Sequence, residues 1–123
     1  MLKKRVKYVD YNGEERDEDF YFNLSKAEIT EMELSETGGL SNLLTRIVEE
    51  KNTKKIMLMF KDIVLKSYGE KSIDGKRFVK NQELRDSFEQ SEAYVEVFME
   101  LAGNAEAATN FINGIMPKIE NKQ

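Results

Sequence analysis

The sequence predicts a mainly α-helical, α+β protein, in which an N-terminal β-hairpin is followed by a compact bundle of five or six short helices. Apolar and polar residues alternate around one Asn-Gly pair near the N-terminus, apolar residues then recur at helical spacing, and capping residues separate the helical segments. The chain has 123 residues, which suits one domain with one modest core. We expect this domain to span residues 1–117, with the hairpin in 1–24, helices in 25–117 and a frayed tail in 118–123.

The hairpin is predicted from two alternating segments on either side of Asn12-Gly13, with Val6 and Tyr8 on one face of the first. Asn and Gly both tolerate the positive φ angles of a type I′ turn, which is the turn we expect here. Two strands alone are marginally stable in water, so their apolar face must pack on helices or on another chain.

Capping residues predict where the helices begin and end. Ser25 and Glu28 form a capping box before the first helix, which we expect to end at about Ser35. Five later helical segments are expected: one with an apolar stripe from Leu40 to Val48, one after Asn52 or Thr53 that ends at Gly69 as a left-handed cap, one from Asn81 to about Gln90, one from Ser91 to Gly103, and one from about Ala105 that Pro117 ends.

The composition excludes most enzyme chemistry and most cofactors. The chain has no Cys and no His, which excludes thiolate nucleophiles, disulfides, Cys/His zinc sites and histidine acid–base catalysis. No glycine-rich phosphate loop and no calcium-loop spacing occurs. We therefore expect a protein that is not an enzyme and that has no cofactor and no metal.

The charge and hydropathy patterns also exclude several partners. The 19 Lys and Arg and the 23 Asp and Glu are mixed along the chain, for a formal net charge of -4, which argues against nucleic-acid binding. The longest wholly apolar run, Ile56 to Phe60, is too short to span a bilayer, and no apolar segment follows the basic N-terminus. We therefore expect a cytosolic protein that does not contact membranes.

The predicted helix that ends at Gly69 has apolar residues on its charged side. Leu58 and Leu65, seven positions apart, fall among the lysines, with Met59 at the margin. One interpretation is a central helix that is contacted on nearly all sides. The other is a seam for a partner, in which Lys54 and Lys61 flank the apolar residues.

A turn is predicted after this helix, at Asp74-Gly75. We expect Ile73 and Phe78 to anchor it in the core, which makes the segment a structural hinge between two helices. The alternative is contact with an acidic partner through the surrounding basic residues Lys71, Lys76, Arg77 and Lys80.

A row of like charges, Glu92, Glu96 and Glu100, lies at helical spacing near the C-terminal end. A solvated helix face explains this row. A basic partner, or the protein's own lysines around Lys61, is the alternative.

Four stretches resemble the tail assembly chaperones of tailed bacteriophages: "DFYFNLSKAEITEMELSETGGL", "YGEKSIDGKRFVKN", "AYVEVFMEL" and "FINGIMP". The resemblance extends from about Asp19 to Pro117. The family pattern implies a fold-defining element, and no ligand site, at Tyr68, Gly69, Asp74, Gly75, Arg77 and Phe78.

The resemblance implies a non-enzymatic chaperone that binds the tape measure protein and keeps it soluble while tail tube subunits assemble around it. It also implies that the protein acts in the cytoplasm of an infected or lysogenic host and is absent from the mature virion. Such chaperones are often made in two lengths by a ribosomal frameshift, and this chain would then be the short form. A contact with the tail tube protein and self-association into a homo-oligomer stay open. The alternatives are a structural protein of the virion, in the tail or head-tail connector, and a small regulatory protein that binds one host target.

Overall fold

The computed structural model describes residues 1–33 and 53–117, and it has an α+β fold. Within this range it contains four strands and five helices: β1 (Leu2–Val9), β2 (Glu15–Phe22), α1 (Lys26–Glu33), α3 (Thr53–Ser67), β3 (Tyr68–Lys71), β4 (Phe78–Val79), α4 (Gln82–Glu89), α5 (Glu92–Ala102) and α6 (Ala105–Ile115). The end of the first predicted helix near Ser35, the predicted helix around 40–48 and the predicted tail 118–123 lie outside the described residues.

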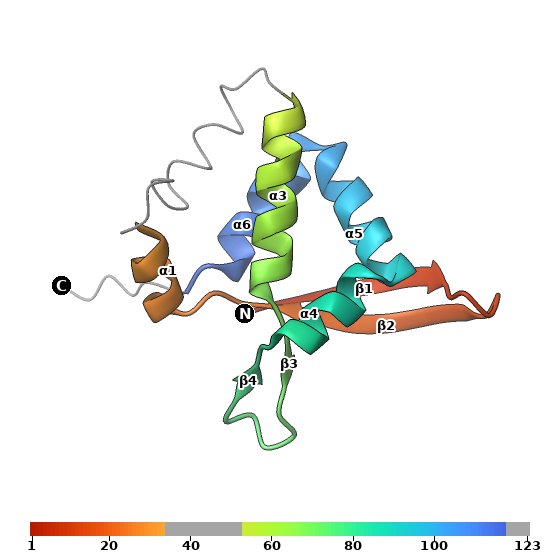
Figure 1. Cartoon of the computed structure of the whole chain (residues 1–123), viewed down its shortest axis with the longest axis horizontal. Coiled ribbons are helices and arrows are strands. Elements are labelled where there is room, and N and C mark those ends of the chain that lie inside the picture. The colour runs from red at the N-terminus through yellow and green to blue at the C-terminus, as the bar shows by residue number, and fades with distance from the viewer. Residues whose placement is uncertain (34–52, 118–123) are drawn as a thin grey trace.

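The strands form one antiparallel sheet in the order β1-β2-β3-β4. The N-terminal hairpin is confirmed, but the expectation that residues 25–117 contain only helices is wrong, because β3 and β4 extend the sheet. β3 pairs with the last residues of β2, Tyr21 with Gly69 and Phe22 with Tyr68. In Figure 1, α3, α5 and α6 lie on one side of the β1–β2 hairpin, and the β3–β4 hairpin projects from the other side.

The turn between β1 and β2 differs from the predicted type I′ turn. The backbone N–H of Asp10 donates to the carbonyl of Glu14 (2.9 Å), and Asp10 Oδ1 accepts from the N–H groups of Asn12 and Glu14. Gly13 has a φ of 82°, and no described residue other than glycine has a positive φ. The connection is therefore a three-residue loop in which glycine alone takes the left-handed conformation.

The two faces of the β1–β2 hairpin have different environments. On the inner face, Val6 and Phe22 are buried against the helices. On the outer face, the Arg5 guanidinium bonds Asp17 at 2.7 Å and Asp19 at 3.2 Å, across the two strands. The outer face of this hairpin is therefore charged and solvated, as the alternation predicts.

The core is built around aromatic rings from separate elements. Tyr68 stacks on Phe88 with ring centroids 4.2 Å apart, and Phe22 meets Phe111 edge-on at 5.2 Å. The buried hydrophobic residues are Val6, Phe22, Leu24, Phe60, Ile63, Val64, Tyr68, Phe88, Ala93, Val97, Leu101, Ala108, Phe111, Ile112 and Ile115. One cluster thus joins β1, β2 and β3 to α3, α4, α5 and α6.

The predicted caps are present at the helix starts. The backbone N–H of Ser25 donates to Glu28 Oε1 (2.8 Å), and the Glu28 N–H donates to Ser25 Oγ (3.1 Å), which is the reciprocal capping box. Asn81 and Ser91 cap α4 and α5. The Lys80 ammonium also donates to Glu28 Oε2 (2.7 Å), so the start of α1 is tied to the chain that leaves β4.

Candidate protein-interaction surfaces

The segment predicted to be a hinge between helices is a β-hairpin. α3 ends at Ser67, and Gly69 lies inside β3 with no positive φ, so the prediction that Gly69 is a left-handed cap is wrong. A β-carbon at Gly69 would lie 2.7 Å from Phe78 Cε2 and 2.8 Å from the Val79 carbonyl oxygen. Glycine is therefore needed here because the Phe78 ring covers the neighbouring strand.

The tip of the β3–β4 hairpin is held by polar contacts. Ser72 Oγ donates to Asp74 Oδ1 (2.7 Å), which also accepts from the Lys76 N–H (3.0 Å), and Gly75 has a φ of 77°. The hydrogen bond from the Lys76 N–H lowers the pKa of Asp74 most, and the hydrogen bond from the Ser72 hydroxyl lowers it further. Ile73 is 102% exposed, so the expectation that it anchors the turn in the core is wrong. The turn keeps its shape through its own hydrogen bonds and presents Ile73 to solvent.

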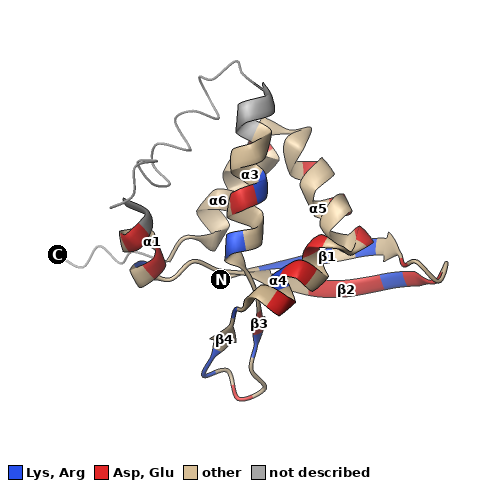
Figure 2. Ribbon diagram, viewed as in Figure 1, with Lys and Arg blue, Asp and Glu red and all other residues tan. Residues whose placement is uncertain are grey.

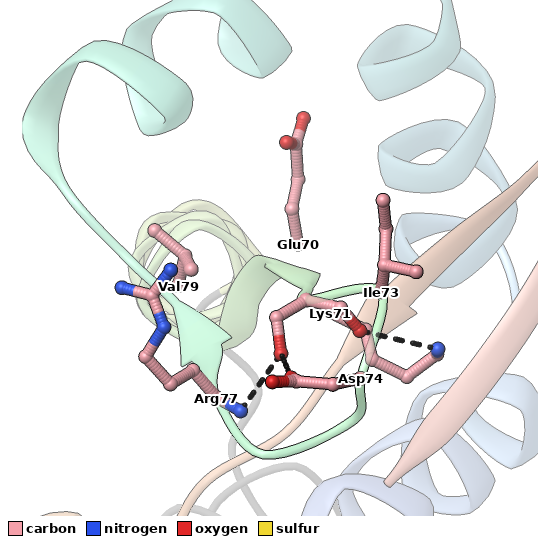
Figure 3. A pocket seen from close by; sticks show the side chains of 7 residues that line it. Glu70, Lys71, Ile73, Asp74, Arg77 and Val79 are labelled. Carbon is pink, nitrogen blue, oxygen red and sulfur yellow. Dashed lines mark hydrogen bonds between the residues drawn. The ribbon is translucent and has the colours of Figure 1, made fainter.

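One side of this hairpin is concave. Glu70, Ile73, Arg77 and Val79 rise around an open hollow of about 500 Å³ (Figure 3). Asp74, which also lines it, is bonded into the turn. The sequence indicates this site only through its basic residues. The exposure of Ile73 could not be predicted, because it depends on the pairing of β3 with β4.

The second candidate surface is the charged side of α3. Leu58 is 61% exposed, whereas Leu65 and Met59 are partly buried and pack against the core. The two leucines therefore have different surroundings, and Leu58 is the exposed one. Lys61 lies beside Leu58 and its ammonium is 3.0 Å from Glu89, a hydrogen bond that raises the pKa of Lys61. The predicted flanking side chain of Lys54 lies outside the described side chains.

The third surface, on α5, was missed from the sequence. Val95 is 39% and Met99 61% exposed, on the side of the helix opposite the buried Val97 and Leu101. The two are four residues apart, so their side chains are neighbours on the helix surface. Plotting the segment at 100° per residue would have separated this pair from the inward residues.

The glutamate row of α5 is partly engaged. Glu100 forms an ion pair with Lys4, with 2.9 Å between the carboxylate oxygen and the ammonium nitrogen. The Tyr11 hydroxyl donates to Glu92 at 3.0 Å, and this hydrogen bond raises the pKa of Tyr11. Among the described side chains, those of residues 1–31 and 57–117, Glu96 has no ion-pair partner. Figure 2 shows acidic residues on α5, and both acidic and basic residues on the β3–β4 hairpin, with Lys71 in β3 and Arg77 just before β4.

Exposed apolar side chains are the main surface feature of the described residues. In the part of the chain that the structure describes, no cluster of three or more Asp and Glu could hold a metal ion, and no helix is long and apolar enough to cross a membrane. Leu58 and Met99, each 61% exposed, lie on helices whose opposite sides are buried in the core.

The chain belongs to the phage tail assembly chaperone family, whose model, described as "Phage tail assembly chaperone", matches residues 1–122. This match confirms the resemblance noted in the sequence, and membership of a chaperone family implies a non-enzymatic role. No curated protein and no solved structure matches the chain.

Proposed function

We propose that this protein is a tail assembly chaperone that binds the tape measure protein and keeps it soluble in the host cytoplasm while the tail tube assembles. The family match supports the general role. The observation that supports binding of a client is the exposure of Leu58, 61%, on the lysine side of α3. We use "client" below for the tape measure protein.

The exposed leucine lies on a helix that the core holds in place. Phe60, Ile63 and Val64 are almost fully buried on the opposite side of α3. A side chain presented on such a helix loses little further freedom on binding. A long amphipathic client helix could therefore lay its apolar face along α3, as in other helix-on-helix complexes.

The charges around Leu58 suit a client with acidic residues beside its apolar stripe. Lys61 and Lys66 are exposed on this side of α3. Each is already paired, Lys61 with Glu89 and Lys66 with Asp62. These exposed pairs are weak, so their lysines can turn to client carboxylates at little cost.

Co-expression with the client tests the proposal. We expect Leu58→Ser to reduce the amount of client captured in a pull-down and the fraction of client that stays soluble. Val9→Thr is the matched control, because Val9 is also exposed, 53%, but lies on the β1–β2 hairpin. A folded Leu58→Ser protein that captures the client as well as the wild type does would contradict the proposed site.

Analysis of purified phage particles tests the alternative role as a structural protein of the virion. A chaperone leaves before the particle is complete, so we expect no peptides of this chain in mature virions by mass spectrometry. Stoichiometric amounts there would favour the structural role.

A further inference from the structure

We propose that the outward side of α5 is a docking site for a basic amphipathic helix of a partner protein. This side carries two exposed apolar residues, Val95 and Met99, and two glutamates, Glu92 and Glu96. It is separate from the Leu58 side of α3, and binding there needs no client. The inference therefore goes beyond the proposed function.

The charge of α5 favours a basic partner. The helix contains three glutamates and no basic residue. Lys4 reaches it from β1 but is already paired with Glu100, at 2.9 Å. Glu92 and Glu96 have no ion-pair partner among the side chains that the structure describes, and the neutral Tyr11 hydroxyl leaves the charge of Glu92 in place. Two carboxylates are thus available to the Lys or Arg residues of a partner, which would also relieve the repulsion between them.

The neighbouring helices add to the negative potential around α5. From Gln82 to Ile115, seven carboxylates stand against one basic residue, Arg85. The seven are Glu83, Asp86, Glu89, Glu92, Glu96, Glu100 and Glu106. A surface of one sign attracts partners of the other sign and repels nucleic acids and anionic membranes. The charge therefore favours a basic segment of a protein over these other classes of partner.

The apolar residues of this side form a row beside the glutamates. Val95 is 39% and Met99 61% exposed, and they are neighbours on the helix surface because they are four residues apart. Next to them the Tyr94 ring stacks on that of Phe98, with centroids 5.8 Å apart, and both rings are partly exposed. Methionine is flexible and adapts to the shape of a partner, and aromatic faces attract cations. This combination suits a partner with both apolar and basic side chains.

The spacing of the two rows suits a helical partner. The apolar row and the acidic row each repeat after four residues, about one helical turn, which is also the repeat of the two faces of an amphipathic helix. α5 has 11 residues and is about 16 Å long, so about three turns of a partner helix can lie along it. The buried Val97 and Leu101 hold α5 in the core, so little freedom is lost on binding. In Figure 1, α5 lies at the edge of the molecule that faces away from α1.

Binding of synthetic peptides to the full chain tests the site. The probe is a fluorescent peptide of about 14 residues, made of Leu and Lys, with the leucines on one helix face. By fluorescence anisotropy we expect a Kd between about 10 µM and about 100 µM at about 50 mM salt, and binding at least fivefold weaker at about 500 mM salt. A Leu/Glu peptide of the same pattern and a Leu/Lys peptide of scrambled order are the controls, and each should bind about tenfold more weakly.

Four variants of the protein locate the binding of the Leu/Lys peptide. Met99→Ser should weaken it by about tenfold, whereas Ile73→Ser, which removes a more exposed apolar side chain far from α5, should leave it unchanged. Glu96→Lys should weaken it by about fivefold. Glu31→Lys makes the same charge change at an exposed position of α1 and should have a clearly smaller effect. Circular dichroism melting confirms that each variant folds.

Four results would overturn the proposal. These are no binding of the Leu/Lys peptide up to about 1 mM, a Leu/Glu or scrambled peptide that binds as tightly, a Glu31→Lys effect as large as that of Glu96→Lys, and association of the pure protein with itself that Met99→Ser abolishes. The third would mean that net charge alone attracts the peptide. The fourth, measured by sedimentation, would make a second copy the occupant of α5.

Discussion

At Gly69 two strands approach more closely than any larger residue would allow. The Phe78 ring lies over the glycine on one face of the β3–β4 hairpin, while Tyr68, the preceding residue, is buried in the core. Glycine is needed at this position because it has no β-carbon, and not because its backbone can adopt a positive φ.

Gly69→Ala should destabilise the protein by about 1–3 kcal/mol, the usual cost of overpacking. The added methyl would meet the Val79 carbonyl oxygen at 2.8 Å, and a backbone atom cannot move aside easily. Gly114→Ala is the control, because its methyl would meet the flexible end of Leu2 at 3.0 Å and would improve a helix. Urea unfolding of both variants checks the difference, and equal losses would contradict it.

A second single-residue effect concerns Glu28 and acid stability. Burial alone raises the pKa of Glu28, but the hydrogen bonds from Lys80 and from the Ser25 N–H outweigh it, so the pKa lies below the ordinary value of 4.5. A carboxyl whose pKa is lowered on folding stabilises the protein above its unfolded pKa, and this contribution is lost as the pH falls below about 4.5 through the folded value. The pKa of Lys80 is lowered by its own burial, which offsets part of this gain at neutral pH.

Glu28→Gln should therefore lower stability at pH 7 and flatten the loss of stability below pH 4.5, because the variant has no carboxyl to protonate at this position. Urea unfolding at several pH values between about 3 and 7 measures this slope. Glu31→Gln, on the same helix and exposed, should keep the acid slope of the wild type. An unchanged slope in Glu28→Gln would show that the Lys80–Glu28 pair does not contribute.

At the scale of elements, local signals were sufficient where a helix begins. The capping box at Ser25 and Glu28 and the caps at Asn81 and Ser91 are each set by neighbours within three residues, so the sequence alone predicts them. β3 was missed because its pairing with Tyr21 brings together residues far apart in the chain. A strand of four residues has too short a pattern to reveal that partner.

The candidate surfaces were predicted only in part for a similar reason. The helical wheel of α3 correctly placed Leu58 and Leu65 on the charged side, but it could not tell which of them a neighbouring element covers. Leu65 lies where α4 approaches, since Arg85 Nε donates to its carbonyl at 3.2 Å. Leu58 has no such cover and remains 61% exposed.

Leu58 and Leu65 should therefore respond differently to the same substitution. Leu65→Ser should lower the free energy of unfolding by about 2 kcal/mol, because it removes a partly buried side chain from the core. Leu58→Ser should change it by less than about 0.5 kcal/mol, as is usual at the surface. Thermal or urea unfolding compares the two variants directly. A large loss of unfolding free energy in Leu58→Ser would favour the interpretation of α3 as a central helix that is contacted on nearly all sides.

At the scale of the whole molecule, one core supports three outward surfaces that point in different directions. Leu58 on α3 lies beside Lys61, and Val95 and Met99 on α5 lie beside Glu96. The hollow of the β3–β4 hairpin is lined by two basic residues, Lys71 and Arg77, and two acidic residues, Glu70 and Asp74 (Figure 2). Because the outward sides of α5 and α3 differ in charge, one partner does not suit both. The lysines beside Leu58 would suit an acidic client, whereas the glutamates of α5 would repel it.

If the client binds α3 and not the outward side of α5, two variants should separate these surfaces in the purified complex with the tape measure protein. Leu58→Ser should bind the client poorly, because it removes the exposed apolar side chain beside Lys61. Met99→Ser should bind the client as the wild type does, since Met99 is equally exposed, 61%, but lies on α5 among glutamates. Light scattering of the size-separated complex gives the amount of each variant bound to the client. If Met99→Ser lost the client as fully as Leu58→Ser does, α5 would belong to the client surface, and the assignment of the client to α3 alone would be wrong.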